Sequence, residues 1–131
     1  MRAYLVFSET NDHWAGGLLR GRFKHVHVLL YDEPTNIWLF HNYGSEGHVM
    51  RVFGSGDVDV KAFSEREGGT VVALTARPAE AIRLPLVLNN CVGMAKALCG
   101  LRTWAVTPDQ LYRSVKPLDQ GTHGCASYTL T

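Results

Sequence analysis

The chain has 131 residues, of which 46% are hydrophobic and 19% charged, and its formal net charge is +1. This length suits a single domain with a core of its own, and the composition excludes a disordered chain. The sequence contains no run of lysine and arginine, so we expect no nucleic-acid partner. Its three irregularly spaced cysteines do not make a disulfide framework, which indicates free thiols in a reducing compartment.

Residues 1–7 form a short apolar segment at the N-terminus. The segment is too brief for the core of a signal peptide and lacks a small-residue cleavage site, so we interpret it as a first strand. No stretch approaches the roughly 20 apolar residues that a helix needs to cross a bilayer, and we expect no membrane span. Synthesis and folding in the cytoplasm are therefore predicted.

The pattern of apolar and turn residues predicts one α+β domain over residues 1–131, a mostly antiparallel sheet with helices packed on it. The predicted strands cover residues 2–8, 24–31, 37–43, 46–53 and 70–75. A further strand or edge piece is predicted at 58–63, and a last strand at 126–130. The predicted helices cover residues 88–99 and a segment that starts at Thr107, with a short helix or turn at 11–20, while 78–86 is ambiguous.

The segment Asn89-Asn90-Cys91-Val92-Gly93 is the strongest functional signal, because it indicates a helix that begins at a cysteine. Asn89 or Asn90 can cap the helix, and Gly100 can end it in the left-handed conformation. A thiol in the first turn faces the positive end of the helix dipole, which favours the thiolate. Since the thiolate is the attacking form, this is where cysteine hydrolases place their nucleophile.

The predicted hairpin of residues 24–31 and 37–43 offers a base for that thiol. If Tyr31 pairs with Ile37, then His41 shares a strand face with His25 and can orient its imidazole. A slip by one residue places Asn42 opposite His25 and gives it this role instead, because the slip exchanges the two faces of the strand. The turn sequence leaves both registers open, with His41 slightly favoured.

These features together resemble a papain-like fold of the NlpC type in its circularly permuted form, in which the histidine strand precedes the cysteine helix. The pairing of Phe23-Lys24-His25 with a Cys-Val helix and a Thr-Pro…Leu-Tyr helix also resembles small proteins of tailed bacteriophages. The resemblance covers residues 22–43 and 88–113, less than half of the chain. Asn90 and Val92 depart from the NlpC pattern, which usually has Asp before the cysteine and a small polar residue after it.

The resemblance implies a cysteine hydrolase, either an amidase or a peptidase, with Cys91 as nucleophile, His25 as general base and His41 or Asn42 as orienting residue. It implies bacterial peptidoglycan or another peptide as substrate, synthesis in the cytoplasm of an infected host, and no soluble cofactor. The alternative is a structural component of a phage particle or its tail, with other virion proteins as partners. Such a component would keep the papain-like fold with little or no activity.

Simpler interpretations exist for most of these residues. His25, His27 and His41 could instead form an open three-histidine metal site that resembles the metal strand of cupins. Buried packing is the default for Cys91, Cys99 and a strand histidine such as His27. Core packing is likewise expected for Trp38, a core or interface position for Trp14 and Trp104, a structural role for Cys125, and a surface position for His13, His48 and His123.

Overall fold

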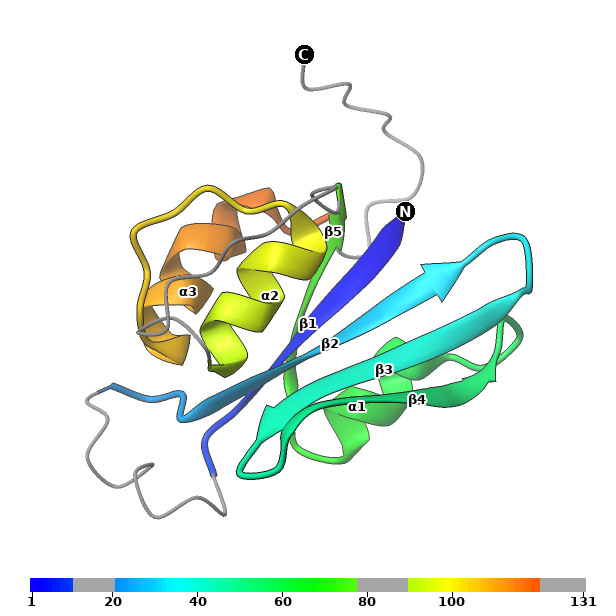
Figure 1. The fold of residues 1–131 in the computed structure, drawn as a ribbon, viewed down its shortest axis with the longest axis horizontal. Helices are drawn as coiled ribbons and strands as arrows, with labels where there is room; N and C mark the ends of the chain where they lie inside the picture. Colours follow the sequence, from blue (N-terminus) through cyan, green and yellow to red (C-terminus); the bar gives the residue numbers. More distant parts are fainter. Residues whose placement is uncertain (11–20, 78–89, 121–131) are drawn as a thin grey trace.

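The computed structural model describes residues 1–10, 21–77 and 90–120, and these form an α+β fold around one antiparallel sheet (Figure 1). Its strand order is β4-β3-β2-β1-β5, and every neighbouring pair is antiparallel. The strands are β1 (Arg2–Ser8), β2 (His25–Asp32), β3 (Ile37–Gly44), β4 (Gly47–Ser55) and β5 (Thr70–Thr75). The predicted α+β class and mostly antiparallel sheet are confirmed.

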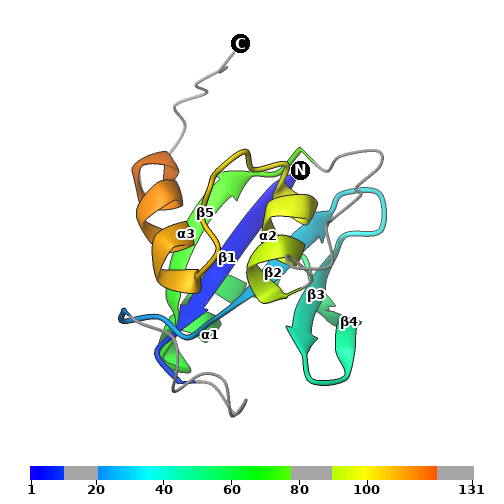
Figure 2. The same ribbon diagram turned by 60° about the vertical axis from the view of Figure 1, so that its left-hand side comes forward.

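Helices cover both faces of this sheet (Figures 1 and 2). One face carries α2 (Cys91–Cys99) and α3 (Pro108–Val115), and a 3₁₀ turn at Lys116–Leu118 follows α3. The other face carries α1 (Val60–Arg66). Side chains alternate along β2, so Val26 and Val28 enter the core under α2 and α3, while Leu29 enters the smaller core under α1.

The strand predicted at residues 58–63 is wrong, because this segment starts α1. Asp59 caps the helix by accepting a hydrogen bond from the Ala62 N–H at 3.0 Å. Val60 and Phe63, three residues apart, both turn toward the sheet, where Val60 is buried and Phe63 contacts the ring of Phe53. A short apolar segment of this kind has no period long enough to separate helix from strand.

Hydrogen bonds at both ends of α2 hold this helix in place against β2 and β3. At its start the Asn90 side chain accepts a hydrogen bond from the Gly93 N–H at 2.9 Å, which assigns the cap to Asn90. At its end Gly100 adopts φ 66°, a left-handed conformation, and the Arg77 N–H donates to the Cys99 carbonyl oxygen at 3.1 Å. The Cys91 thiol is therefore carried on a helix whose two ends are both fixed.

The second predicted helix start is confirmed at α3. Thr107 and Gln110 form a reciprocal capping box, and Pro108 occupies the first helical position. No helix in the described part of the chain is long and apolar enough to cross a membrane. Predictions for the segments 11–20, 78–86 and 126–130, and for Asn89, His13, Trp14, His123 and Cys125, lie outside the described residues.

Candidate active site

The β2–β3 hairpin adopts neither of the two registers considered above, because it is shifted by one residue in the direction that leads toward Asn42 opposite His27 rather than opposite His25. Asp32 pairs with Ile37 and Val28 with His41, so the register with Tyr31 opposite Ile37 is wrong. His41 therefore shares a face with Val28, on the side of α2, and His25 and Asn42 project to the opposite side of their strands. The one-residue difference exchanges His41 for Asn42, as expected for a period of two.

Asn42 lies against His25, and their hydrogen bond joins the start of β2 to the end of β3. The distance from His25 Nε2 to Asn42 Oδ1 is 2.6 Å, and both side chains are partly exposed. An amide oxygen only accepts, so Nε2 carries the proton and Nδ1 of the neutral ring keeps a lone pair. Asn42 thus selects the imidazole tautomer in which Nδ1 can take a proton from a neighbouring group.

His41 is held by a different partner, His48 on β4. Its Nδ1 lies 2.9 Å from His48 Nε2, and its side chain is only 5% exposed. Burial, and next the charge of His48, lower the pKa of His41 from 6.5 to about 4. The slightly favoured assignment of His41 as the orienting residue of His25 is therefore wrong, while the predicted surface position of His48 is confirmed.

Cys91 is the first residue of α2, and its sulfur reaches the backbone at the start of β2. Burial raises the pKa of the Cys91 thiol, while hydrogen bonds from the backbone N–H groups of Val26, Val92 and Cys91 itself act in the opposite direction. The Val26 N–H belongs to the peptide that joins His25 to Val26. The sulfur thus lies one peptide from the proposed base, and the net effect of its surroundings favours the neutral thiol at rest.

The first turn of α2 leaves two backbone donors beside the sulfur. The Gly93 N–H donates to the side-chain oxygen of Asn90, and the Met94 N–H donates to the carbonyl oxygen of Asn90, at 2.9 Å each. The N–H groups of Cys91 and Val92 have no acceptor within the helix, as expected at positions N1 and N2. These two donors point at the region of the thiol, where a carbonyl oxygen under attack would also lie.

The β2–β3 ladder ends near this corner. Its last pair toward the site is Val28 with His41, so the described pairing does not extend to His25. Cys91 approaches this strand end from the α2 side, and the imidazole of His25 approaches it from the side of α1. Among the described residues the structure thus brings His25 together with Asn42, whereas the Cys91 thiol lies on the other side of the strand end, with the His25–Val26 peptide between the thiol and the ring.

The three-histidine metal interpretation is contradicted by the same register. His25 and His27 project to the α1 side, whereas His41 projects to the α2 side. The described ranges contain no group of three or more His, Cys, Asp or Glu side chains placed to hold a metal ion. His27 instead packs against the ring of Phe40, and burial, followed by the charge of His25, lowers its pKa to about 4.

Packing explains other residues singled out in the sequence. Cys99 and Trp38 are each 3% exposed, which confirms their core positions. Burial also raises the pKa of Cys99 to about 12, so this thiol stays protonated and differs from Cys91 in its surroundings. Trp104, in contrast, is 99% exposed and is not a core residue.

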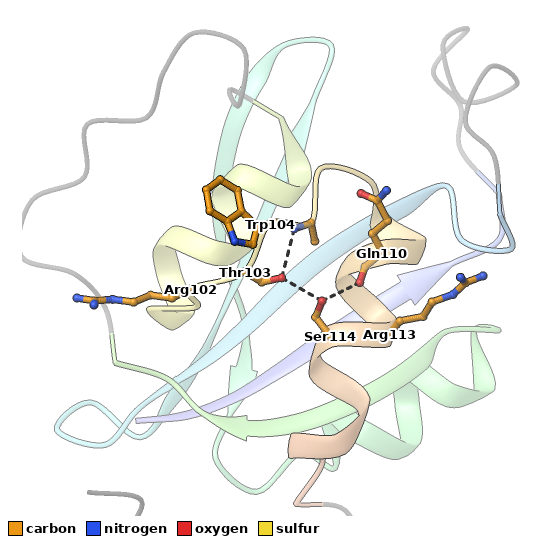
Figure 3. A pocket seen from close by; sticks show the side chains of 7 residues that line it. Arg102, Thr103, Trp104, Gln110, Arg113 and Ser114 are labelled. Atoms are coloured by element: carbon orange, nitrogen blue, oxygen red, sulfur yellow. Dashed lines mark hydrogen bonds between the residues drawn. The ribbon is translucent and has the colours of Figure 1, made fainter.

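A hollow of about 560 Å³ lies beside α3, and Cys91 is not among the residues that line it (Figure 3). Thr103 donates to the Ser114 hydroxyl, which donates to the Gln110 carbonyl oxygen, both at 3.0 Å. The described residues that line this hollow include no histidine and no carboxylate, and the side chains of Arg102 and Arg113 diverge from one another. This hollow therefore lacks the nucleophile and base that hydrolysis requires.

Two features of the corner escaped sequence reasoning. The contact of the thiol with the Val26 N–H depends on tertiary packing and has no sequence signal. The His41–His48 pair follows from the β3–β4 register, in which His41 opposes Met50 and Tyr43 opposes His48. Diagonal neighbours on one sheet face could have indicated that pair.

Comparisons with protein-family models, curated proteins and solved structures found no match.

Proposed function

We propose that this protein is a cysteine hydrolase that cleaves amide or peptide bonds, with Cys91 as nucleophile, His25 as general base and Asn42 as orienting residue. The observation that carries the proposal is the 2.6 Å bond from His25 Nε2 to Asn42 Oδ1, made one peptide from a helix-start thiol. A nucleophile, a base and a group that orients the base are the three components of such a site.

The reaction starts from the neutral pair. Because burial raises the pKa of the Cys91 thiol, His25 Nδ1 removes its proton as the sulfur attacks the carbonyl carbon. The backbone N–H groups of Cys91 and Val92 stabilise the resulting oxyanion, and one such donor contributes roughly 3 kcal/mol in enzymes where it has been removed. The His25 imidazolium then protonates the leaving amine, and water, deprotonated by His25, hydrolyses the thioester to free the thiol.

Asn42 contributes through His25. The Nε2–H···Oδ1 bond holds the ring in one tautomer and one orientation, so that Nδ1 remains the proton acceptor in each cycle. The amide is uncharged, and it stabilises the imidazolium as a dipole rather than as a counter-ion. The finer part of the proposal is a permuted papain-like relationship, with a bacterial cell-wall peptide as substrate and a phage as source, and it rests on the sequence resemblance.

The assay is release of amines from purified peptidoglycan and from a panel of fluorogenic peptidyl amides. Cys91→Ala is expected to abolish turnover, and His25→Ala to reduce kcat by about 10²–10⁴-fold, the usual contribution of a general base. Asn42→Ala is expected to reduce kcat less, and Asn42→Asp to retain part of the rate. His27→Ala is the matched control on the same strand and should leave kcat within about threefold, since proton transfer needs only His25.

A structural role in a phage particle is the second candidate, and the burial of Cys91 favours it. A fold that has lost activity keeps a protonated, packed thiol at the start of α2, in line with the raised pKa. In that case all five variants should behave alike on every substrate, and the chain should co-purify with assembled particles.

A further inference from the structure

A second hollow, here called the α1 pocket, lies between α1 and the strands beneath that helix. Its volume is about 170 Å³, close to the roughly 150 Å³ of an engineered cavity that binds benzene. Three phenylalanine rings line it, Phe40 from β3, Phe53 from β4 and Phe63 from α1. The α1 pocket is therefore large enough for a small ligand.

The three rings come together from separate elements. Phe53 is the extra residue of the β-bulge in β4, so it is paired with no residue of β3. Its ring centroid lies 5.2 Å from that of Phe63, at an interplanar angle of 72°. Phe63 is 40% exposed, so a large ring is open to solvent at the pocket instead of being packed in the core.

Glu67 places a negative charge on the same lining. This exposed residue ends α1, where a carboxylate opposes the helix dipole and does not stabilise the helix. It has no ion-pair partner among the residues that the structure describes. The His27 ring beside Phe40 is uncharged at neutral pH, because burial lowers its pKa to about 4. Arg51, which opposes Phe40 on β4, is not among the lining residues.

The neighbouring rings on this face of the sheet already bind a cation of the chain itself. The Arg2 guanidinium lies 4.0 Å from the ring centroid of Tyr31 and 5.7 Å from that of Trp38. No cation in the described part of the chain lies over a ring of the α1 pocket. These rings and the carboxylate thus remain accessible to a cation from outside the chain.

We propose that the α1 pocket binds a small organic cation, namely an alkylated ammonium group such as trimethylammonium. Aromatic rings attract a cation through their negative π faces, and cages of such rings recognise quaternary ammonium ligands. A primary ammonium is strongly hydrated, and the mostly apolar lining would not replace the hydrogen bonds that it makes with water. The unpaired Glu67 carboxylate supplies the complementary charge. The site is separate from the proposed reaction, because none of the three catalytic side chains lines it.

Titration of the isotope-labelled protein with choline, followed by NMR spectra of the backbone amides, tests the proposal. The amide signals of α1, Phe40 and Phe53 should shift saturably with a dissociation constant of about 1 mM, as expected for so small a ligand. The carbon analogue of choline, in which an uncharged tert-butyl group replaces trimethylammonium, should bind at least about fivefold more weakly. Acetylated trimethyllysine amide, titrated in the same way, distinguishes a modified side chain from a free small molecule as the source of the group.

Two substitutions and a matched control separate the contributions of ring and charge. Phe63→Leu keeps an apolar side chain without the ring, and should weaken choline binding at least about threefold. Glu67→Gln keeps the size of the side chain without the charge, and should weaken binding by a similar factor of about three. Glu65→Gln is the control on the same helix, because Glu65 lies 3.8 Å from Lys61 and does not line the pocket. It should leave the affinity for choline unchanged.

The proposal is overturned if choline causes no shift of these signals up to about 20 mM. It is also overturned if the carbon analogue binds as tightly as choline, a result that identifies the pocket as merely apolar. Equal effects of Glu65→Gln and Glu67→Gln overturn it as well. The comparison of choline with its analogue needs no substitution, and Glu67 is exposed, so the test holds even if Phe63→Leu fails to fold.

Discussion

The buried imidazole of His41 and the partly buried imidazole of His27 make the stability of this protein sensitive to mild acid, and the larger burial of His41 makes it the clearer test. The pKa of His41 falls from 6.5 to about 4 on folding, through burial and the neighbouring His48. The unfolded chain therefore binds the proton more readily. The contribution of His41 is fully present above pH 6.5 and is lost as the pH falls toward 4.

The full shift corresponds to about 3 kcal/mol, since one pKa unit is equivalent to about 1.4 kcal/mol. About 2 kcal/mol of this is lost by pH 5, where the unfolded histidine is almost fully protonated and the folded one is mostly neutral. His27 acts in the same direction because its pKa is also lowered to about 4. Few carboxylates titrate between pH 8 and pH 5, so the histidines dominate the change in this window.

Urea denaturation at pH 8 and pH 5, followed by circular dichroism, measures the effect. His41→Gln keeps a hydrogen-bonding group beside His48 but cannot titrate, so its loss of stability between the two pH values should be about 2 kcal/mol smaller than that of the wild type. Comparing each protein with itself cancels the intrinsic cost of the substitution. The reasoning is refuted if His41→Gln and the wild type lose the same stability over this interval.

Three further substitutions test how the site is supported. Asn90→Ala should lower the free energy of unfolding by about 1 kcal/mol through loss of the Gly93 N–H acceptor, and Asn90→Ser should recover most of it in the same denaturation assay. Gly100→Ala should cost more, at least about 1–2 kcal/mol, because a Cβ there clashes with the Arg77 carbonyl and φ is 66°; an unchanged melting temperature would contradict this. Thr107→Ala should cost about 1 kcal/mol through loss of the capping box, with Thr107→Ser as control.

Local signals in the sequence predict much of the fold. The alternating and β-branched segments give five strands to within two residues of their observed ends, and polar caps locate Cys91 and Pro108 as helix starts. The failure at residues 58–63 has a physical cause, because a helix of seven residues capped by Asp59 is too short to show a clear helical period. Tertiary packing against the sheet then decides the outcome.

The candidate site also combines residues that local sequence signals reveal with residues whose roles depend on register and packing. Cys91 and His25 could be selected from their own surroundings in the sequence, whereas the choice between His41 and Asn42 depended on one residue of hairpin register. Neither the length of the turn nor its composition determines that register. The raised pKa of Cys91 could not be foreseen either, because the burial that causes it comes from elements distant in the chain.

The pH dependence of Cys91 alkylation tests the central claim most directly. Iodoacetamide modification, followed by peptide mapping to separate Cys91 from the other thiols, reports thiolate formation at this position. If His25 accepts the thiol proton, the wild-type rate below pH 9 should exceed that of His25→Ala and, to a lesser extent, that of Asn42→Ala, while His27→Ala should match the wild type. A single step above pH 9, identical in the wild type and His25→Ala, would contradict the claim that thiol and imidazole act together.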